Sequence, residues 1–468
     1  MHGYIDRFHA RRRATVAALG LMVAALTAPA GAQSVAATAA ASTTPATITF
    51  NDAIAIALRQ NATLKQSENA AAMSATNVAS RKSAFLPTLS LVTQSAENVG
   101  RNFSQIDGSI SDQTSHSLST GLSSSVVLFD GLRNVSELRA AKLSESASNG
   151  DLTRARQTTV FTVASDFLTL VTTQAQLQVQ RQNLAAQEAQ ESQLQRLVAA
   201  GARPISELYQ QQATTAGARS SVVTAEHQVE LAKIGLIQTL QLDPRATYDF
   251  APPAMPTGAR VARSFQLDSL LDRAFASRAD LVAEQDRVEA AAQGTKAATA
   301  SRLPTVSLSA GYNTAYNSTN DLAFSDQLNQ RRGGSVSIGV SIPLFDRGAT
   351  TAATQQAKLE EDNARLALAN ERQTIALEVR RAYLDHESTR EQLAAAEAQQ
   401  KAADLAVSTT EQRYKIGSST LLELTLARGA QVQAASAVVS ARYTLVFQEA
   451  LMPYYTGDLD PARAVLGD

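Results

Sequence analysis

Residues 86–91 read Leu-Pro-Thr-Leu-Ser-Leu, and residues 303–308 read Leu-Pro-Thr-Val-Ser-Leu, which places them 217 positions apart (86 to 303). Leu-Phe-Asp recurs in the same way at residues 128–130 and 344–346, 216 positions apart (128 to 344). A nearly constant offset over such distances indicates that most of the chain consists of two repeats of one unit.

Each Leu-Pro stretch is followed by two segments in which apolar residues alternate with Ser and Gly. The clearest are residues 118–128 and 336–344, and residues 306–312 follow the same pattern. A period of two predicts β-strands with one apolar face and one face of small polar side chains. We therefore expect four strands per chain. Strands of a β-sandwich share this pattern, but four strands among so many helical residues argue against a sandwich.

Helices account for the rest of each repeat. The first is expected at residues 51–82 and 268–301, and it ends at Leu-Pro because the residue before a proline disfavours helical backbone. Residues 132–200 contain no proline, and apolar residues from Val160 to Leu177 recur at heptad-like spacing, which is typical of a coiled coil. A helix of this length would measure about 100 Å.

Asp130 and Asp346 are the expected N-caps of the two long helices. Each long helix is expected to end at a glycine, Gly201 or Gly417, and a return helix follows it. Each repeat is therefore expected to be a helical hairpin joined to a strand hairpin.

Residues 1–32 have the features of a cleaved export signal. Arginines occupy 11–13, residues 14–26 are apolar, and 30–32 read Ala-Gly-Ala, the small residues that a signal peptidase reads. The alternative is a single membrane anchor, but the apolar run is shorter than the about 20 residues of a helical span. We expect the mature chain to begin at Gln33. Beyond that point no apolar stretch is long enough for a helical span, so any membrane span would consist of strands.

The expected organisation follows from the repeat and from the Pro-rich stretch between its two parts. In order, it comprises a signal peptide (1–32), a flexible leader (33–47), the first repeat (48–243), a connector (244–264), the second repeat (265–452) and a C-terminal tail (453–468).

Composition argues against several classes of function. The chain has no cysteine, which excludes thiolate zinc sites, thiol catalysis and a lipid anchor on cysteine. Residues 385–387, Asp-His-Glu, do not form a His-Glu-x-x-His motif and are expected on a charged helix face, and residues 333–334, Gly-Gly, open a strand and not a phosphate-binding loop. We expect no catalytic residue, no metal and no cofactor, and we expect that the protein is not an enzyme.

The charge balance is mildly acidic. Residues 1–32 carry four Arg and one Asp, so their removal changes the formal net charge from −1 to −4. We therefore expect no binding to nucleic acid.

The strands also constrain assembly. Strands in a bilayer must close into a barrel, because an open edge leaves unpaired amides in hydrocarbon. Four strands are too few, since the smallest bacterial barrels have about 8, so several chains must share one barrel. Its apolar face would contact outer-membrane lipid, its Ser/Gly face would line a wet lumen, and Phe129 and Phe345 would lie in the interfacial aromatic belt. The expected fold is mainly α with a small β part: a long α-helical coiled-coil barrel joined to a transmembrane β-barrel that protomers share.

The duplicated order of helix, Leu-Pro, strands, Leu-Phe-Asp and long helix resembles the TolC-like outer membrane efflux protein family over residues 48–452. Residues 413–417, Arg-Tyr-Lys-Ile-Gly, and the Leu-Leu-Glu-Leu that follows are similar to that family's second periplasmic turn. The resemblance implies a homotrimer in the outer membrane of a Gram-negative envelope, with a 12-stranded barrel continuous with a periplasmic helical tunnel. It implies a passive exit channel for tripartite efflux or type I secretion, docked to a periplasmic adaptor and an inner-membrane transporter. The family's cargo includes drugs, small toxic molecules and secreted proteins.

The resemblance further implies a gate at the periplasmic end, where acidic side chains, a tyrosine and an arginine narrow the tunnel. Counted from the turn glycines, the acidic positions fall on Glu207 and Glu423, and the tyrosine falls on Tyr414. Ser419 stands where the family has the arginine, and Leu426 stands where it has a second acid. The alternative for the two glutamates is a solvated helix start that the helix dipole favours.

The resemblance implies adaptor docking at the two hairpin tips. These tips comprise Gly201, Ala202, Arg203, Gly417, Ser418 and Ser419.

Two other classes share part of the pattern. A periplasmic coiled-coil adaptor has long helices, but it does not need four alternating strands flanked by Leu-Pro and Leu-Phe-Asp. A porin has many regularly spaced strands and few helices.

Overall fold

The structure is a computed structural model that describes residues 46–461 apart from residues 104–107, 109 and 252–262. The expected signal peptide, nearly all of the leader, most of the connector and the last seven residues of the tail lie outside the described residues.

Each repeat begins with two short helices, α2 (Phe50–Gln60) and α3 (Ala62–Ser83) in the first and α6 (Leu267–Ser277) and α7 (Ala279–Ala300) in the second. The sequence predicts one helix in each place, and this is wrong. The backbone is non-helical at Asn61 (ψ 123°) and Arg278 (ψ 117°). The Asn61 side chain then caps α3 by accepting a hydrogen bond from the N–H of Leu64 at 3.0 Å.

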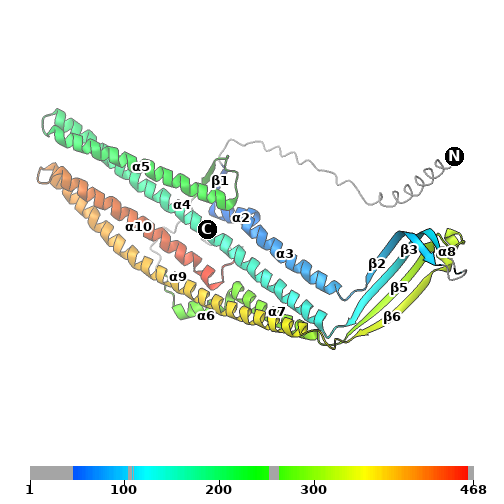
Figure 1. Cartoon of the computed structure of the whole chain (residues 1–468). Helices are drawn as coiled ribbons and strands as arrows, with labels where there is room; N and C mark the ends of the chain where they lie inside the picture. The colour runs from blue at the N-terminus through cyan, green and yellow to red at the C-terminus, as the bar shows by residue number, and fades with distance from the viewer. Residues whose placement is uncertain (1–45, 104–107, 109, 252–262, 462–468) are drawn as a thin grey trace, which may run out of the picture. The chain divides into compact units, whose positions relative to one another are not determined.

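The four predicted strands form one antiparallel sheet in the order β2-β3-β5-β6 (Figure 1). They are β2 (Thr88–Phe103), β3 (Ile110–Phe129), β5 (Thr305–Asn317) and β6 (Gly333–Ser341), and a short helix, α8 (Phe324–Gln330), lies between the last two. The four alternating segments that the sequence predicts as strands are therefore confirmed as strands of one sheet.

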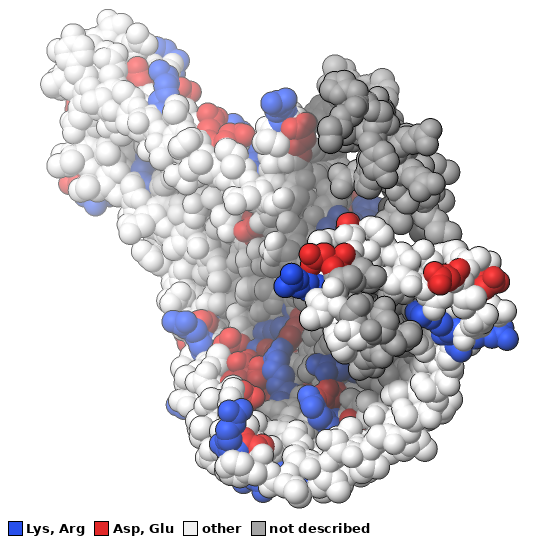
Figure 2. All heavy atoms as spheres, turned by 45° about the vertical axis from the view of Figure 1, so that its right-hand side comes forward, with Lys and Arg blue, Asp and Glu red and all other residues white. Residues whose placement is uncertain are grey.

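The register separates the two faces of the sheet. Ser90, Ser123, Gly311 and Ser335 lie side by side on one face. The next row, on the opposite face, contains Leu91, Leu122 and Tyr312, which are 69%, 43% and 51% exposed in the single chain. Neither β5 nor β6 contains Lys, Arg, Asp or Glu, and Figure 2, which turns the sheet toward the viewer, shows most of this surface as uncharged. A single chain therefore exposes a broad apolar face on its sheet.

Two helical hairpins follow the strands. The long helices α4 (Arg133–Ala199) and α9 (Ala349–Lys415) have 67 residues each, a length of about 100 Å. They pack along α5 (Ile205–Leu240) and α10 (Leu421–Thr456), respectively (Figure 1). Because α4 and α9 start beside the sheet, the hairpin tips lie at the opposite end of these helices.

The two aspartates near the start of α4 and α9 are not the N-caps. Leu132 and Gly348 occupy the cap positions with left-handed backbone, two residues after Asp130 and Asp346. Each carboxylate still accepts a backbone N–H from the first helical turn, at 2.9 and 2.7 Å. The predicted interaction is present, but the tight turn shifts it by two residues.

The largest core surrounds the middle of α4, where the residues of its predicted apolar stripe are buried. A parallel pair of three-residue strands, β1 (Ala46–Ile48) and β4 (Tyr248–Phe250), covers this core, and the sequence analysis did not predict it. His386 of α9, expected on a charged face, is fully buried. The helix α10 continues through Pro453 to Thr456 and past the expected boundary, because Met452 and Thr456 are buried. No helix in the described ranges is long and apolar enough to cross a membrane.

Gly150 allows α4 and α7 to approach closely, which gives a test of this packing. A Cβ at Gly150 would lie 2.8 Å from the carbonyl oxygen of Ala279, whereas a Cβ at Gly217 of α5 would meet nothing within 4 Å. Gly150→Ala should therefore lower the free energy of unfolding by about 1–2 kcal/mol. Gly217→Ala, the control, should raise it by about 0.5–1 kcal/mol through helix propensity. Thermal unfolding followed by circular dichroism measures both, and equal effects would contradict this packing.

Candidate functional site

Both hairpin tips turn at the predicted glycines. Gly201 (φ 72°) and Gly417 (φ 79°) adopt left-handed backbone, which glycine reaches without steric cost. In the first tip the N–H of Ala202 donates to the carbonyl of Leu197 at 2.8 Å, and the second tip repeats this bond. These bonds occupy carbonyls that the helix end leaves without donors. The local sequence therefore determines both turns.

A hydrogen bond joins the two tips. The hydroxyl of Tyr414, in the last turn of α9, donates to Oε2 of Glu207, in the first turn of α5, at 2.8 Å. Tyr414 is 4% exposed and packs in a small apolar cluster with Leu194, Leu208 and Leu424. The structure thus brings together two of the three residues that the resemblance implies for the gate, and they come from different repeats.

Arg203 contacts the same pair from the first tip. Its guanidinium lies 4.6 Å from the centroid of the Tyr414 ring, and its Nη2 donates to the Tyr414 carbonyl at 3.0 Å. Its Nη1 lies 3.6 Å from Oε1 of Glu207. The sequence analysis includes Arg203 only as a tip residue. The i,i+4 spacing of Arg203 and Glu207 is a signal for their ion pair, but no local pattern indicates the contact with Tyr414.

Glu423 makes a separate set of contacts at the second tip. Its backbone N–H donates to Oγ1 of Thr420 at 3.2 Å, and its carboxylate accepts a hydrogen bond from the hydroxyl of Ser419. This hydroxyl is the main cause that lowers the pKa of Glu423. Within a single chain, Glu423 is therefore not joined to the pair of Tyr414 and Glu207. At Ser419, where the resemblance implies an arginine, the structure has a neutral donor.

Burial and the neighbouring carboxylate keep the Tyr414 hydroxyl protonated. Burial is the larger cause and the Glu207 carboxylate the second, and together they raise the pKa of Tyr414 to about 12. The phenol therefore remains a hydrogen-bond donor throughout the neutral range.

The two aromatic residues expected at the membrane interface lie beside the sheet. Phe129 ends β3 and is 42% exposed, and Phe345 follows β6 and is 85% exposed. Both are therefore available for contact with surroundings outside the chain.

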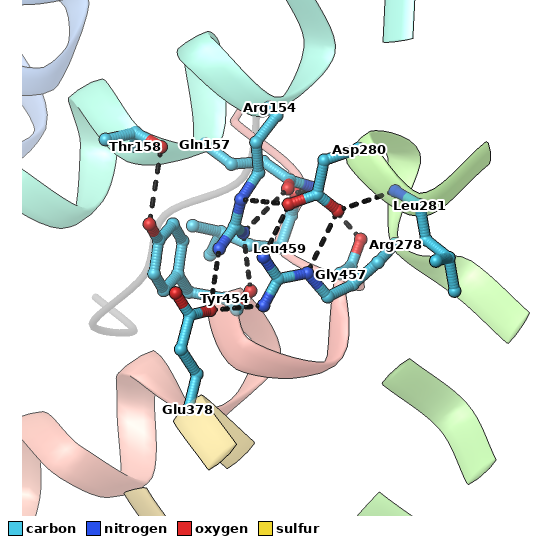
Figure 3. Close-up of polar contacts among 10 residues, drawn as sticks. All are labelled: Arg154, Gln157, Thr158, Arg278, Asp280, Leu281, Glu378, Tyr454, Gly457 and Leu459. Carbon is cyan, nitrogen blue, oxygen red and sulfur yellow. Dashed lines mark hydrogen bonds and ion pairs between the residues drawn. The ribbon is translucent and has the colours of Figure 1, made fainter. Parts of the chain in front are cut away.

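Figure 3 shows a second polar cluster, which we call the waist network and which comprises Arg154, Gln157, Arg278, Asp280, Glu378 and the end of α10. The sequence analysis did not predict it. Arg278, at the break between α6 and α7, is 2% exposed and donates to Asp280 at 3.0 Å and to Glu378 of α9 at 2.6 Å. Arg154 of α4 lies 3.3 Å from Asp280, and it donates to the carbonyl of Tyr454 at 2.8 Å. The network therefore joins the first repeat to three helices of the second.

The waist network also holds the end of α10. Gln157 of α4 donates to the carbonyls of Gly457 and Leu459 at 2.9 and 3.1 Å (Figure 3). Its members come from separate parts of the chain, around residues 154–157, 278–280, 378 and 454–459, and follow no motif, so only the fold reveals the network. Among the described residues, no group of three or more His, Cys, Asp or Glu side chains is placed to hold a metal ion.

The family model described as outer membrane efflux protein matches residues 53–240 and 270–452. The chain belongs to the outer membrane efflux protein family. The predicted family is therefore confirmed. The protein is the outer-membrane exit channel of an efflux system.

Two relatives support the assignment of the chain to this family. The chain is 24% identical over 399 residues to the outer membrane efflux protein BepC of Brucella suis biovar 1 (strain 1330), covering 85% of this chain and 83% of that protein. It is 25% identical over 329 residues to the pyoverdine export outer membrane protein OpmQ of Pseudomonas putida (strain KT2440), covering 69% and 67%. Both matches extend over most of each protein.

The fold is similar to that of a solved outer membrane protein. The outer membrane protein VceC from Vibrio cholerae superposes with a TM-score of 0.76 at 18% identity, covering 87% of this chain and 96% of that chain. The predicted fold class, mainly α with a small β part, is therefore confirmed.

The hydrogen bond between the tips gives a test on this efflux protein. Tyr414→Phe removes the donor to Glu207 and keeps the ring, so it should weaken the joined state by about 1 kcal/mol per chain. The open fraction in planar lipid bilayers should rise several-fold. Tyr209→Phe on α5, where Tyr209 is 61% exposed, is the matched control and should gate like the unmodified protein. Unchanged gating in Tyr414→Phe would show that this bond does not hold the tips.

Alkaline pH should break the same bond. The raised pKa of Tyr414 means that the folded state keeps its proton more tightly than the unfolded state, whose ordinary value is 10.0. The contribution is therefore complete below pH 10 and is lost as pH rises toward about 12. Open fraction measured against pH should rise in this window, and Tyr414→Phe should lack the Tyr414-dependent part of the rise. Identical curves for the two proteins would contradict this.

Proposed function

We propose that three of these chains form the exit channel of a tripartite efflux or type I secretion system, as a passive conduit docked to a periplasmic adaptor and an inner-membrane transporter. The observation that carries the proposal is the four-stranded sheet, whose apolar face is exposed and whose strands β3 and β6 lead into the long helices α4 and α9 of the two helical hairpins. Twelve strands from three chains close one barrel, which pairs the edges that a single chain leaves open.

The two faces of the sheet then have separate surroundings. The face that contains Leu91, Leu122 and Ile338 contacts outer-membrane lipid, and Phe129 and Phe345 lie at its interface with water. The face of Ser and Gly lines the lumen, where hydroxyl groups remain hydrated. The lack of charged residues in β5 and β6 supports this arrangement.

The hairpin tips form the periplasmic end. Tyr414 and Glu207 hold the tips of the two repeats together in the closed state, and Glu423 contributes a ring of carboxylates around the threefold axis. Such a ring attracts cations. The adaptor docks on the same tips, at residues 201–203 and 417–419. The contact between Tyr414 and Glu207 supports the gate.

Reconstitution tests the proposal as a whole. Purified protein added to a planar lipid bilayer should insert and give discrete conductance steps. A coiled-coil adaptor, the alternative that shares the long helices, would give none.

A charge on either face of β6 tests the orientation of the sheet. Ile338 is 67% exposed in the single chain, and its replacement by Arg should cost about 2–4 kcal/mol near the bilayer midplane. Ser337→Arg, on the adjacent residue of the opposite face, should be tolerated. The measurement is the amount of channel recovered in the outer membrane. Equal losses for the two variants would reject the proposed lipid and lumen faces.

A further inference from the structure

Arg203 is the feature of the tips that the proposed function leaves unexplained. Its guanidinium lies over the Tyr414 ring, donates to the Tyr414 carbonyl and stands beside the Glu207 carboxylate. The Arg203 side chain is 23% exposed, so most of it is covered by these contacts. A residue that served only to present charge to a docking partner would extend into solvent instead.

Three electrostatic features of the same sign converge on this guanidinium. The face of the Tyr414 ring carries partial negative charge and attracts a cation. The Tyr414 carbonyl belongs to the last turn of α9, where the helix dipole is negative. The Glu207 carboxylate is the third feature. A planar guanidinium satisfies all three at once because it stacks and donates in different directions.

Other arginines near the tips make contacts within their own hairpin. Arg413 donates to the carbonyl of Ser418, Arg428 pairs with Glu411, and Arg196 donates to Ser192. In the described hydrogen bonds and ion pairs of these side chains, Arg203 alone reaches from one repeat to the other. Arg203 therefore differs from its neighbours by its target and not by its charge.

We propose that Arg203 locks the two hairpin tips together in the closed channel, as a positioning residue that holds Tyr414 against Glu207. The lock requires the planar guanidinium, since its Cζ lies over the ring, its Nη2 donates to the carbonyl and its Nη1 lies beside the carboxylate. This inference rests on the proposed gate. The resemblance implies an arginine at the second tip, where this chain has Ser419, and we assign the corresponding role to Arg203 of the first tip.

Two substitutions at Arg203 and one control test the lock by single-channel recording in planar bilayers. Arg203→Gln should raise the ratio of open to closed channel on the order of tenfold, because it removes the cation from all three contacts. Arg203→Lys should give a smaller rise, since it keeps the charge but not the planar stack. Arg196→Gln, the same change one turn before the tip, should leave the ratio unchanged. Equal gating of Arg203→Gln and the unmodified protein overturns the proposal.

A double variant tests whether Arg203 acts by positioning Tyr414 or by a general effect on the fold. In Tyr414→Leu, which keeps an apolar side chain at this position, Arg203→Gln should change the ratio several-fold less than in the unmodified protein. The thermal unfolding midpoint of Arg203→Gln should match that of Arg196→Gln. An effect of the same size in both backgrounds would show that Arg203 does not act through Tyr414.

The same recordings distinguish failure of the proposed channel from failure of the proposed lock at Arg203. If the unmodified protein gives no conductance, the proposed channel fails. If it conducts and Tyr414→Phe raises the open fraction while Arg203→Gln does not, the gate stands and the lock at Arg203 is wrong.

Discussion

The unpaired backbone groups along the edges of the sheet constrain the whole protein. In the part of the chain that the structure describes, β2 pairs with β3 alone and β6 pairs with β5 alone. In hydrocarbon these N–H and C=O groups require partners, and the exposed apolar face of the sheet is suited to hydrocarbon. Both needs are met when the edges pair with those of further chains. The long helices then extend from a common ring.

Duplication gives each chain two similar hairpins, but the contacts between them are not symmetric. At the tips, the tyrosine comes from the second repeat, and its carboxylate and guanidinium partners come from the first. At the waist network, Arg154 of the first repeat meets Arg278 and its carboxylate partners in the second. These polar contacts connect the repeats within one chain, at two separate levels along the helices.

Features with a local cause could be predicted from the sequence, and features that depend on distant partners could not. Alternation within residues 336–344 and the turn glycines specify strands and tips directly. The breaks at Asn61 and Arg278 depend on caps and on the carboxylates of other helices, and Pro453 stays in a helix because its neighbours are buried. Of the site, the placement of Tyr414 and Glu207 at the same end of the chain followed from family resemblance. Arg203 was predicted only as a tip residue, and its contact with Tyr414 was missed because the two residues lie 211 positions apart.

The central claim is that the sheet of one chain is incomplete, and the mass of the purified protein in detergent tests it most directly. Native mass spectrometry, with bound detergent removed, should give three chains per particle and no stable monomer. A trimer leaves no open edge, whereas a monomer exposes the edges of both β2 and β6. A particle of one chain that retains its strands and remains stable would contradict the account.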